Sequence, residues 1–299
     1  MPVNFGIEEH RILDLFKQNK TFLFEGQKYT IIFSGKPTCG KGEPKTDIYV
    51  RADSDTYKRE FKISFKKANA DFLENKINSE RAAQLFGVNW ADIIRNSTEQ
   101  LKDSFLDKKL IYKTSFGRTE EGAITLGWKF ELLNVESGQL SDKMKLTKKQ
   151  VIDVYAGTNL DENKRNAYVN GEIIRNSGVA NYILFENAPI KTLQDAIDNL
   201  ITIDEYVKGN PSIYFACKAL NYRTYAKKYD GDRPLSVYVN WFINKNNKLD
   251  NKICFDTPLM QGGNIVADKL LNALKSLNIK TTKDINNKNV ENIDCVFDD

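Results

Sequence analysis

The chain has 299 residues, of which 41% are hydrophobic and 28% are charged, and its formal net charge is +4. This length and composition are expected to bury a substantial core, in one large or two modest domains. No segment has the apolar run of a membrane span, and acidic residues interrupt the first segment where a signal peptide would be apolar. We therefore expect a cytoplasmic protein with no membrane partner.

The cysteines and the one histidine limit the metal chemistry. Cys39, Cys217, Cys254 and Cys295 form no C-x-x-C pair, which argues against a zinc knuckle and for a reducing compartment. A multi-histidine metal site is excluded, because His10 stands alone. Carboxylates are the remaining ligands, and they favour a hard cation such as Mg²⁺.

The first part of the chain predicts a helix and then a β-hairpin. Apolar spacing predicts a helix over residues 7–17, and residues 28–35 are typical of a strand. The hairpin is expected over residues 46–67, with "DSDT" as its turn signal. Its second strand alternates between an apolar face and a face that carries Glu60, Lys62, Ser64 and Lys66.

The rest of the chain alternates between helices and strands. Helices are expected over residues 69–87, 89–109, 146–157, 192–209 and 265–279. A strand pair or one long bent strand is expected over residues 122–135, and strands are expected over residues 212–229 and 234–255. There is no internal repeat, and the predicted fold class is mixed α/β.

The loop between the first strand and the hairpin has part of a nucleotide-binding motif. Gly35, Gly40 and Lys41 satisfy G-x-x-x-x-G-K. Gly42 follows where a triphosphate site needs Ser or Thr, and Pro44 and a strand follow where it needs a helix. We therefore expect a basic connection near a phosphate backbone instead of an NTPase site.

The hairpin carries the groups that phosphodiester hydrolysis requires. A divalent cation must be held by carboxylates, with a lysine nearby. Asp47 begins one strand, and the next strand offers Glu60, Lys62 and Lys66. The residues alone thus favour a magnesium-dependent nuclease. The alternative is that these polar residues form only the solvated face of an edge hairpin.

"PKTD" (residues 44–47) and "EFKISFKK" (residues 60–67) resemble the PD-(D/E)xK nuclease superfamily, and in style Type II restriction endonucleases. The resemblance covers residues 6–87. It implies a restriction-endonuclease-like core, a mixed β-sheet flanked by helices, over residues 1–115. Residues 116–299 would form a C-terminal α/β extension that completes the core and contributes DNA recognition, with a soft boundary that leaves a single domain open.

The resemblance also implies an activity and partners. In the family, the aspartate and the acidic residue of the (D/E)xK strand bind magnesium, and the lysine positions or activates the attacking water. It implies a sequence-specific endonuclease for double-stranded DNA, a homodimer, and a cognate DNA methyltransferase in the same system. The alternative is a non-catalytic DNA-binding or phage-type protein that retains the fold.

Two assignments of the active set remain open. The first takes Asp47 with Glu60 and Lys62, which matches the family pattern literally as "EFK". The second takes Asp47 with Ser64 and Lys66.

In the second assignment the missing carboxylate is Glu80 of "NSERAAQ", as in superfamily members with S-x-K on the strand and a glutamate on the next helix. Asp47 faces Glu60 if the turn is centred on residues 53–54, and Ser64 if it is centred on residues 55–56. We favour the second, because "KISFKK" ends the strand just before the helix.

DNA contacts are expected from basic residues and polar loops. "NYRTYAKKYDGDR" interleaves tyrosines with basic residues, which suits phosphate contact or stacking. Two polar, glycine-containing loops are candidates for base recognition, one with Arg118 and the other with Arg175 and Asn176. The expected DNA-binding residues are Lys36, Lys41, Lys67, Arg118, Arg223, Lys227 and Lys228.

Overall fold

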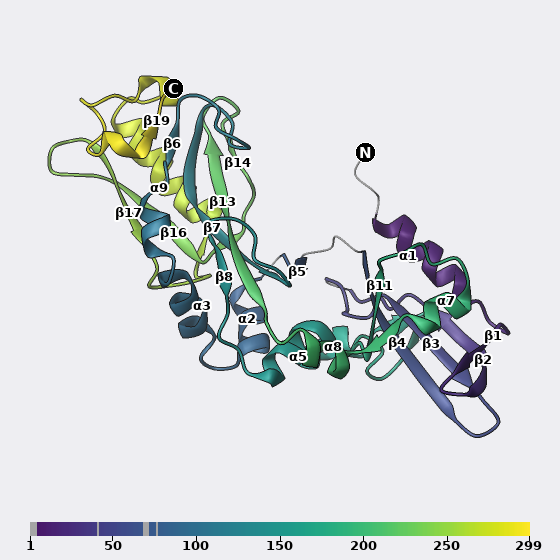
Figure 1. The fold of residues 1–299 in the computed structure, drawn as a ribbon. Coiled ribbons are helices and arrows are strands. Elements are labelled where there is room, and N and C mark those ends of the chain that lie inside the picture. Colours follow the sequence, from purple (N-terminus) through teal and green to yellow (C-terminus); the bar gives the residue numbers. More distant parts are fainter. Residues whose placement is uncertain (1–4, 41, 68–71, 76) are drawn as a thin grey trace. The chain divides into compact units, whose positions relative to one another are not determined.

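The computed structural model describes residues 5–40, 42–67, 72–75 and 77–299, so the expected DNA contact Lys41 lies outside the described residues. The chain divides into two compact units (Figure 1). The first unit combines Met1–Asp71 with Leu146–Pro211, and the second combines Phe72–Lys145 with Ser212–Asp299. The chain passes from one unit to the other after residues 71, 145 and 211. The boundary expected between residues 115 and 116 lies inside the second unit.

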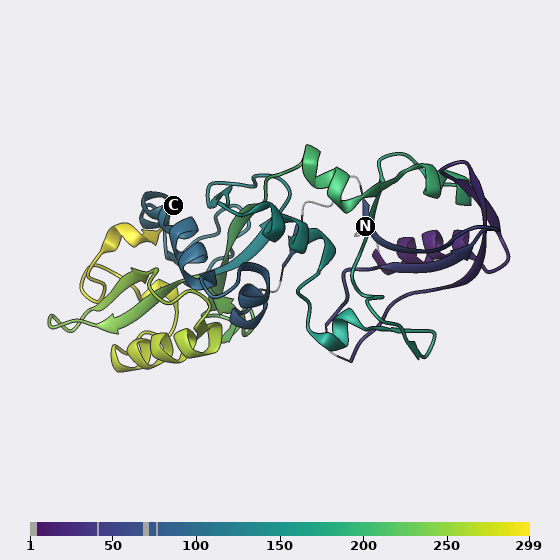
Figure 2. The same ribbon diagram turned by 90° about the horizontal axis from the view of Figure 1, so that it is seen from below.

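In the described part of the first unit, six strands form one sheet in the order β1-β2-β3-β4-β11-β12. Neighbouring strands are antiparallel, except that β4 and β11 are parallel. The strands are β1 (Thr21–Phe24), β2 (Gln27–Gly35), β3 (Ile48–Asp53), β4 (Lys58–Lys67), β11 (Tyr182–Glu186) and β12 (Leu200–Thr202). Figure 2 shows the curled sheet of this unit with its helices beside it.

Helices cover both faces of this sheet, and a short hairpin completes the unit. The helices are α1 (Phe5–Leu13), the 3-10 helix η1 (Asp14–Phe16), α5 (Lys148–Ala156), α6 (Glu162–Arg165), α7 (Leu193–Asp198) and α8 (Ile203–Gly209). The hairpin pairs β9 (Tyr168–Val169) with β10 (Glu172–Ile173). Its turn residues, Asn170 and Gly171, both have positive φ, as a two-residue hairpin turn requires.

One face of the sheet holds the core of the first unit. Ile12 and Phe16 from the N-terminal helices and Leu193 from α7 pack against this face. Phe61 of β4 is fully buried at its centre and has Phe22, Phe24, Tyr29 and Tyr182 as ring neighbours. On the opposite face, Phe185 of β11 packs against Tyr206 of α8, which also contacts Tyr155 of α5.

The second unit is built around a larger sheet. In its described part, nine strands assemble along the path β14-β13-β7-β16-β17, with β5, β6, β8 and β19 attached. Its strands are β5 (Phe72–Glu74), β6 (Ile111–Tyr112), β7 (Ala123–Leu133), β8 (Ser141–Lys143), β13 (Tyr214–Arg223), β14 (Lys228–Tyr229), β16 (Val237–Ile243), β17 (Leu249–Cys254) and β19 (Val296–Phe297). A separate pair joins β15 (Pro234–Leu235) to β18 (Gln261–Gly262). Its helices are α2 (Ser79–Phe86), α3 (Trp90–Glu99), α4 (Lys102–Leu106), α9 (Gly263–Ser276), and the 3-10 turns η2 (Thr282–Asp284) and η3 (Ile293–Cys295).

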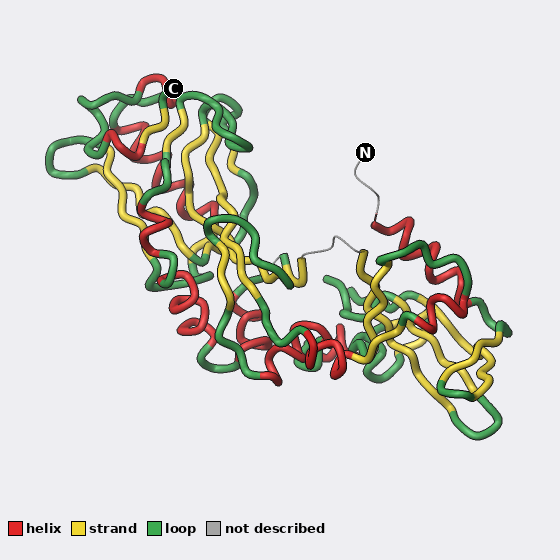
Figure 3. Tube along the Cα trace, viewed as in Figure 1, coloured by secondary structure: helices red, strands yellow, loops and turns green. Residues whose placement is uncertain are grey.

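The expected fold class is confirmed as mixed α/β, with mixed and antiparallel sheets flanked by helices (Figure 3). No helix among the described residues is long and apolar enough to cross a membrane. The strand expected over residues 122–135 is the single strand β7. Gly127 has φ 152° there, and a Cβ would lie 2.5 Å from the carbonyl oxygen of Val237, so the close approach of β16 requires glycine.

Three helix predictions were too long. Residues 72–74 of the first form strand β5, and its helix begins only at Ser79, where Asn78 caps it. The second is interrupted between α3 and α4. The third contains strand β12, because residues 200–202 pair with β11. Tertiary pairing overrides helical spacing in the first and third cases.

Phe61→Ala tests the core of the first unit. Its ring is fully buried among four aromatic rings, so we expect the free energy of unfolding to fall by about 3–5 kcal/mol. Leu23 is an exposed residue of β1, and Leu23→Ala is the matched control. It should change the free energy of unfolding by no more than about 0.5 kcal/mol. Urea unfolding followed by far-UV circular dichroism measures both, and equal destabilisation by the two variants would contradict this packing.

Candidate functional site

The register of the β3–β4 hairpin decides which side chains meet. Ile48 pairs with Ile63 and Asp53 pairs with Lys58, so the turn is centred on residues 55–56. The amide of Asp47, directly before β3, donates to the carbonyl of Ile63 at 2.8 Å. Asp47 therefore stands opposite Ser64, as the second assignment requires.

The carboxylate of Asp47 is held at the end of the hairpin. Its Oδ2 accepts hydrogen bonds from the amide of Phe65 at 2.7 Å and from the Ser64 hydroxyl at 3.4 Å. Its Oδ1 accepts no hydrogen bond from a described residue. One oxygen is thus fixed by β4, and the other remains a potential ligand atom.

Asp47 has a raised pKa of about 6. Burial is the main cause, because it disfavours the charged carboxylate, and the negative charge of Glu9 adds to it. The charges of Lys66 and Lys36 and the amide of Phe65 act in the opposite direction. Two carboxylates and two lysines are therefore electrostatically coupled at one point.

Glu9 reaches this point from α1. Its Oε2 accepts an ion-pair hydrogen bond from Nζ of Lys36, the residue that follows β2. Burial alone would lower the pKa of Lys36, but its bond to Glu9 and the charges of Glu9, Asp47 and Glu43 raise it. Lys36, an expected DNA contact, is thus part of the carboxylate cluster.

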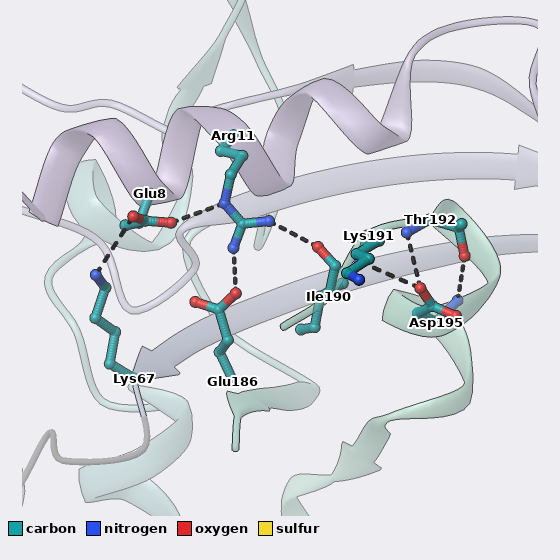
Figure 4. A network of polar contacts seen from close by, with 8 residues as sticks. All are labelled: Glu8, Arg11, Lys67, Glu186, Ile190, Lys191, Thr192 and Asp195. Atoms are coloured by element: carbon teal, nitrogen blue, oxygen red, sulfur yellow. Dashed lines mark hydrogen bonds and ion pairs between the residues drawn. The ribbon is translucent and has the colours of Figure 1, made fainter. Parts of the chain in front are cut away.

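A second polar network fixes α1 beside the ends of β4 and β11 (Figure 4). Arg11 donates to Glu8 at 2.7 Å, to the carbonyl of Ile190 at 2.7 Å and to Glu186 of β11. Glu8 also forms an ion pair with Lys67 at 3.7 Å. The hydrogen bond from Arg11 lowers the pKa of Glu8, with Lys67 contributing. Lys67, another expected DNA contact, therefore stabilises the helix that presents Glu9.

The donor set fits Mg²⁺ in part. Mg²⁺ prefers oxygen ligands and is commonly held by one or two carboxylates together with water and phosphate oxygens. Asp47 and Glu9, whose negative charges interact, are the candidates for such a pair. Among the residues that the structure describes, no group of three or more Asp, Glu, His or Cys side chains could hold a metal ion, so an all-protein cage is not formed.

The first assignment is not brought together by this register. Glu60 pairs with Arg51 in the hairpin, and its carboxylate accepts a hydrogen bond from the hydroxyl of Tyr49. It lies four residues from Ser64, about 13 Å along an extended strand. Lys62 stands opposite Tyr49. Its amide donates to Oδ1 of Asn181, and its carbonyl accepts from the amide of Asn181.

Glu80 and four of the expected DNA contacts belong to the second unit. Glu80 is exposed in the first turn of α2. Arg223 is ion-paired with Glu120 and Asp230, which engages its guanidinium group. Arg118, Lys227 and Lys228 are exposed. Their expected roles stay predictions.

Glu9 was missed by the sequence analysis, although the chain contains a signal for it. Glu9, Ile12 and Phe16 have the spacing of one helix face, and Ile12 and Phe16 are fully buried. The Glu9 side chain is only 18% exposed. A carboxylate on the apolar face of a helix is costly unless it is paired, and this pattern could have marked it as a functional candidate.

Comparison with known proteins finds no matching family model, no matching curated protein and no matching solved structure.

Asp47→Asn tests the electrostatics of the site through stability. The pKa of Asp47 is raised on folding, so ionisation costs folding free energy, and this cost appears as pH rises from about 4 through about 6. The neutral amide avoids the cost. We expect the difference in free energy of unfolding, variant minus wild type, to grow by about 2 kcal/mol between pH 4 and pH 7.

Urea unfolding with EDTA present, at several pH values in this range, measures the difference. Asp55→Asn, in the exposed hairpin turn, is the control and should show little pH-dependent change. A difference for Asp47→Asn that stays constant with pH would show that the site does not disfavour the carboxylate.

Proposed function

We propose that the protein is a magnesium-dependent DNA endonuclease of the PD-(D/E)xK type, with Asp47, Glu9 and Lys66 as its central residues. One observation carries the proposal: the hairpin register puts Asp47 opposite Ser64, on the S-x-K segment that ends in Lys66. Glu9 supplies a second carboxylate from α1. Double-stranded DNA remains the proposed substrate and a homodimer the proposed assembly.

The arrangement of the first unit supports this function. The antiparallel run β2-β3-β4 and the parallel strand β11 belong to one sheet that has helices on both faces, an arrangement that is compatible with a restriction-endonuclease-like core. The carboxylates gather where β3 begins and β4 approaches its end. A substrate phosphate can complete the coordination of a cation that has only two protein carboxylates.

Each residue has a separate role in the proposed reaction. The bound magnesium would supply charge stabilisation for phosphodiester hydrolysis. Asp47 and Glu9 would hold it, with Ser64 and the Phe65 amide orienting Asp47. Lys66 would position the attacking water, and Lys36 would neutralise Glu9 before the cation arrives.

Lys66→Ala and Lys62→Ala form a matched pair, since each removes one lysine from the same face of β4. We expect Lys66→Ala to lower magnesium-dependent cleavage of unmethylated phage or plasmid DNA by at least about 100-fold, and Lys62→Ala to retain it. Cleavage rates on agarose gels, with EDTA lanes and an Asp47→Ala control, measure this. Loss of activity in Lys62→Ala alone would reject the proposed set in favour of Glu60 and Lys62.

Glu9→Gln and Glu80→Gln distinguish the two candidates for the second carboxylate. Glu9 acts on Asp47 within the first unit, so we expect Glu9→Gln to lower the cleavage rate by at least about 100-fold and to raise the magnesium concentration required. Glu80→Gln should cleave like wild type. The opposite result would restore Glu80 as the magnesium ligand.

The same assays address the alternative of a DNA-binding protein without catalysis. Such a protein would bind DNA equally well in EDTA and in magnesium, and Asp47→Ala would change nothing. Discrete magnesium-dependent fragments that disappear in Asp47→Ala would reject it. A cognate DNA methyltransferase, the further proposed partner, would protect the same sites from cleavage.

A further inference from the structure

A basic hollow opens beside the β9–β10 hairpin of the first unit. It has a volume of about 690 Å³ and is lined by Glu162, Arg165, Asn166, Ile173, Arg175 and Asn176. Among the described residues, neither guanidinium group has an ion-pair or hydrogen-bond partner, which contrasts with Arg11, Arg59, Arg81 and Arg223. Two unpaired arginines against one glutamate give the hollow a net positive lining, which is the charge that an anionic ligand requires.

The backbone around the hollow is closely fixed. The Asn176 amide donates to Oδ1 of Asn166 at 2.9 Å, and the Gly178 amide donates to the carbonyl of Arg165 at 3.0 Å. The Ser177 hydroxyl donates to the carbonyl of Ala167 at 2.9 Å. A Cβ at residue 178 would lie 1.8 Å from the carbonyl oxygen of Lys164, so the two segments meet only because glycine is there. The arginines therefore project from a preformed frame.

This frame is joined directly to the candidate site. Thr38 and Tyr168 exchange backbone hydrogen bonds at 2.8 and 2.9 Å. The amides of Lys45 and Thr46 both donate to the carbonyl of Gly178. The glycine-rich loop that leads into Asp47 is thus attached at both ends to the segment that forms the hollow.

The hairpin beside the hollow also exposes apolar surface. Tyr168 and Ile173 pair across the two strands and are 47% and 62% exposed. Ile173 lines the hollow and Tyr168 is its strand partner, so exposed apolar surface adjoins the arginines. Such surface suits the sugar and base of a polynucleotide better than it suits a free inorganic anion.

We propose that this hollow binds a backbone phosphate of the DNA strand, through Arg165 and Arg175, and that Tyr168 and Ile173 contact the adjoining nucleotide. The proposal rests on the proposed function for the identity of the polymer. It assigns DNA contact to residues 162–178, which lie in the unit that holds Asp47.

Fluorescence anisotropy with a labelled duplex of about 20 base pairs tests the proposal, with the full chain in EDTA over a series of NaCl concentrations. We expect Arg165→Ala and Arg175→Ala each to weaken binding about tenfold and to reduce the salt slope by about 1. Arg165→Lys should keep the slope while losing affinity, because it retains the charge but not the planar fork.

Lys17→Ala is the control, since it removes one positive charge from an exposed position of the same unit. It should bind like wild type, and thermal unfolding of every variant should match wild type. Unchanged affinity and slope in both arginine variants would overturn the proposal, and so would a wild-type protein that does not bind the duplex. Isothermal titration calorimetry with inorganic phosphate supplies a further test. Arginine variants that lose affinity for phosphate but bind the duplex like wild type would overturn the proposal.

Cleavage by the same preparations separates this proposal from the proposed function. Wild-type protein that binds DNA through the two arginines without cleaving any substrate would support DNA binding at the hollow and reject the proposed endonuclease activity. Wild-type protein that cleaves, with arginine variants that bind normally, would reject the hollow and retain the nuclease.

Discussion

The hydrogen bond from the Phe65 amide to the Asp47 carboxylate is the contact on which the candidate site depends. It exists only in the hairpin register centred on residues 55–56, which also directs Phe61, Ile63 and Phe65 into the core. A slip of one residue would turn these apolar side chains outward and separate Asp47 from Ser64. The burial that stabilises the first unit therefore also specifies which polar side chains meet.

The N-terminal helix α1 adds charged side chains near the end of β4, where Asp47 is held. Its apolar residues enter the core, and Arg11 forms hydrogen bonds to Glu186 and to the carbonyl of Ile190. Glu9 of the same helix interacts electrostatically with Asp47. Burial, with a smaller contribution from the charge of Glu9, raises the pKa of Asp47, and the charges of Lys66 and Lys36 only partly compensate. Ionisation of Asp47 in this place costs folding free energy, and perturbed carboxyl groups of this kind are common at catalytic and binding sites.

The parallel pairing of β4 with β11 explains the unusual path of the chain. Parallel neighbours need a long crossover connection. Here the chain leaves β4, forms the first segment of the second unit, and returns through α5, the β9–β10 hairpin and the frame of the basic hollow before it enters β11. The returning segment also receives the glycine-rich loop at Thr38, Lys45 and Thr46. The crossover thus contributes surface beside the candidate site as well as closing the sheet.

The mixed α/β class and the alternating hairpin could be predicted from the sequence, because alternation and turn chemistry are local properties. The resemblance added Asp47, Ser64 and Lys66 as one of two candidate sets. The Asn170-Gly171 pair is a local hairpin signal of the same kind, and both residues have positive φ in the turn between β9 and β10. Only the tertiary structure decided the hairpin register, the contribution of Glu9, the discontinuous units and the strand formed by residues 200–202. Each of these depends on contacts between segments that are distant in the chain or on which alternative turn closes, and local spacing carries no information about either.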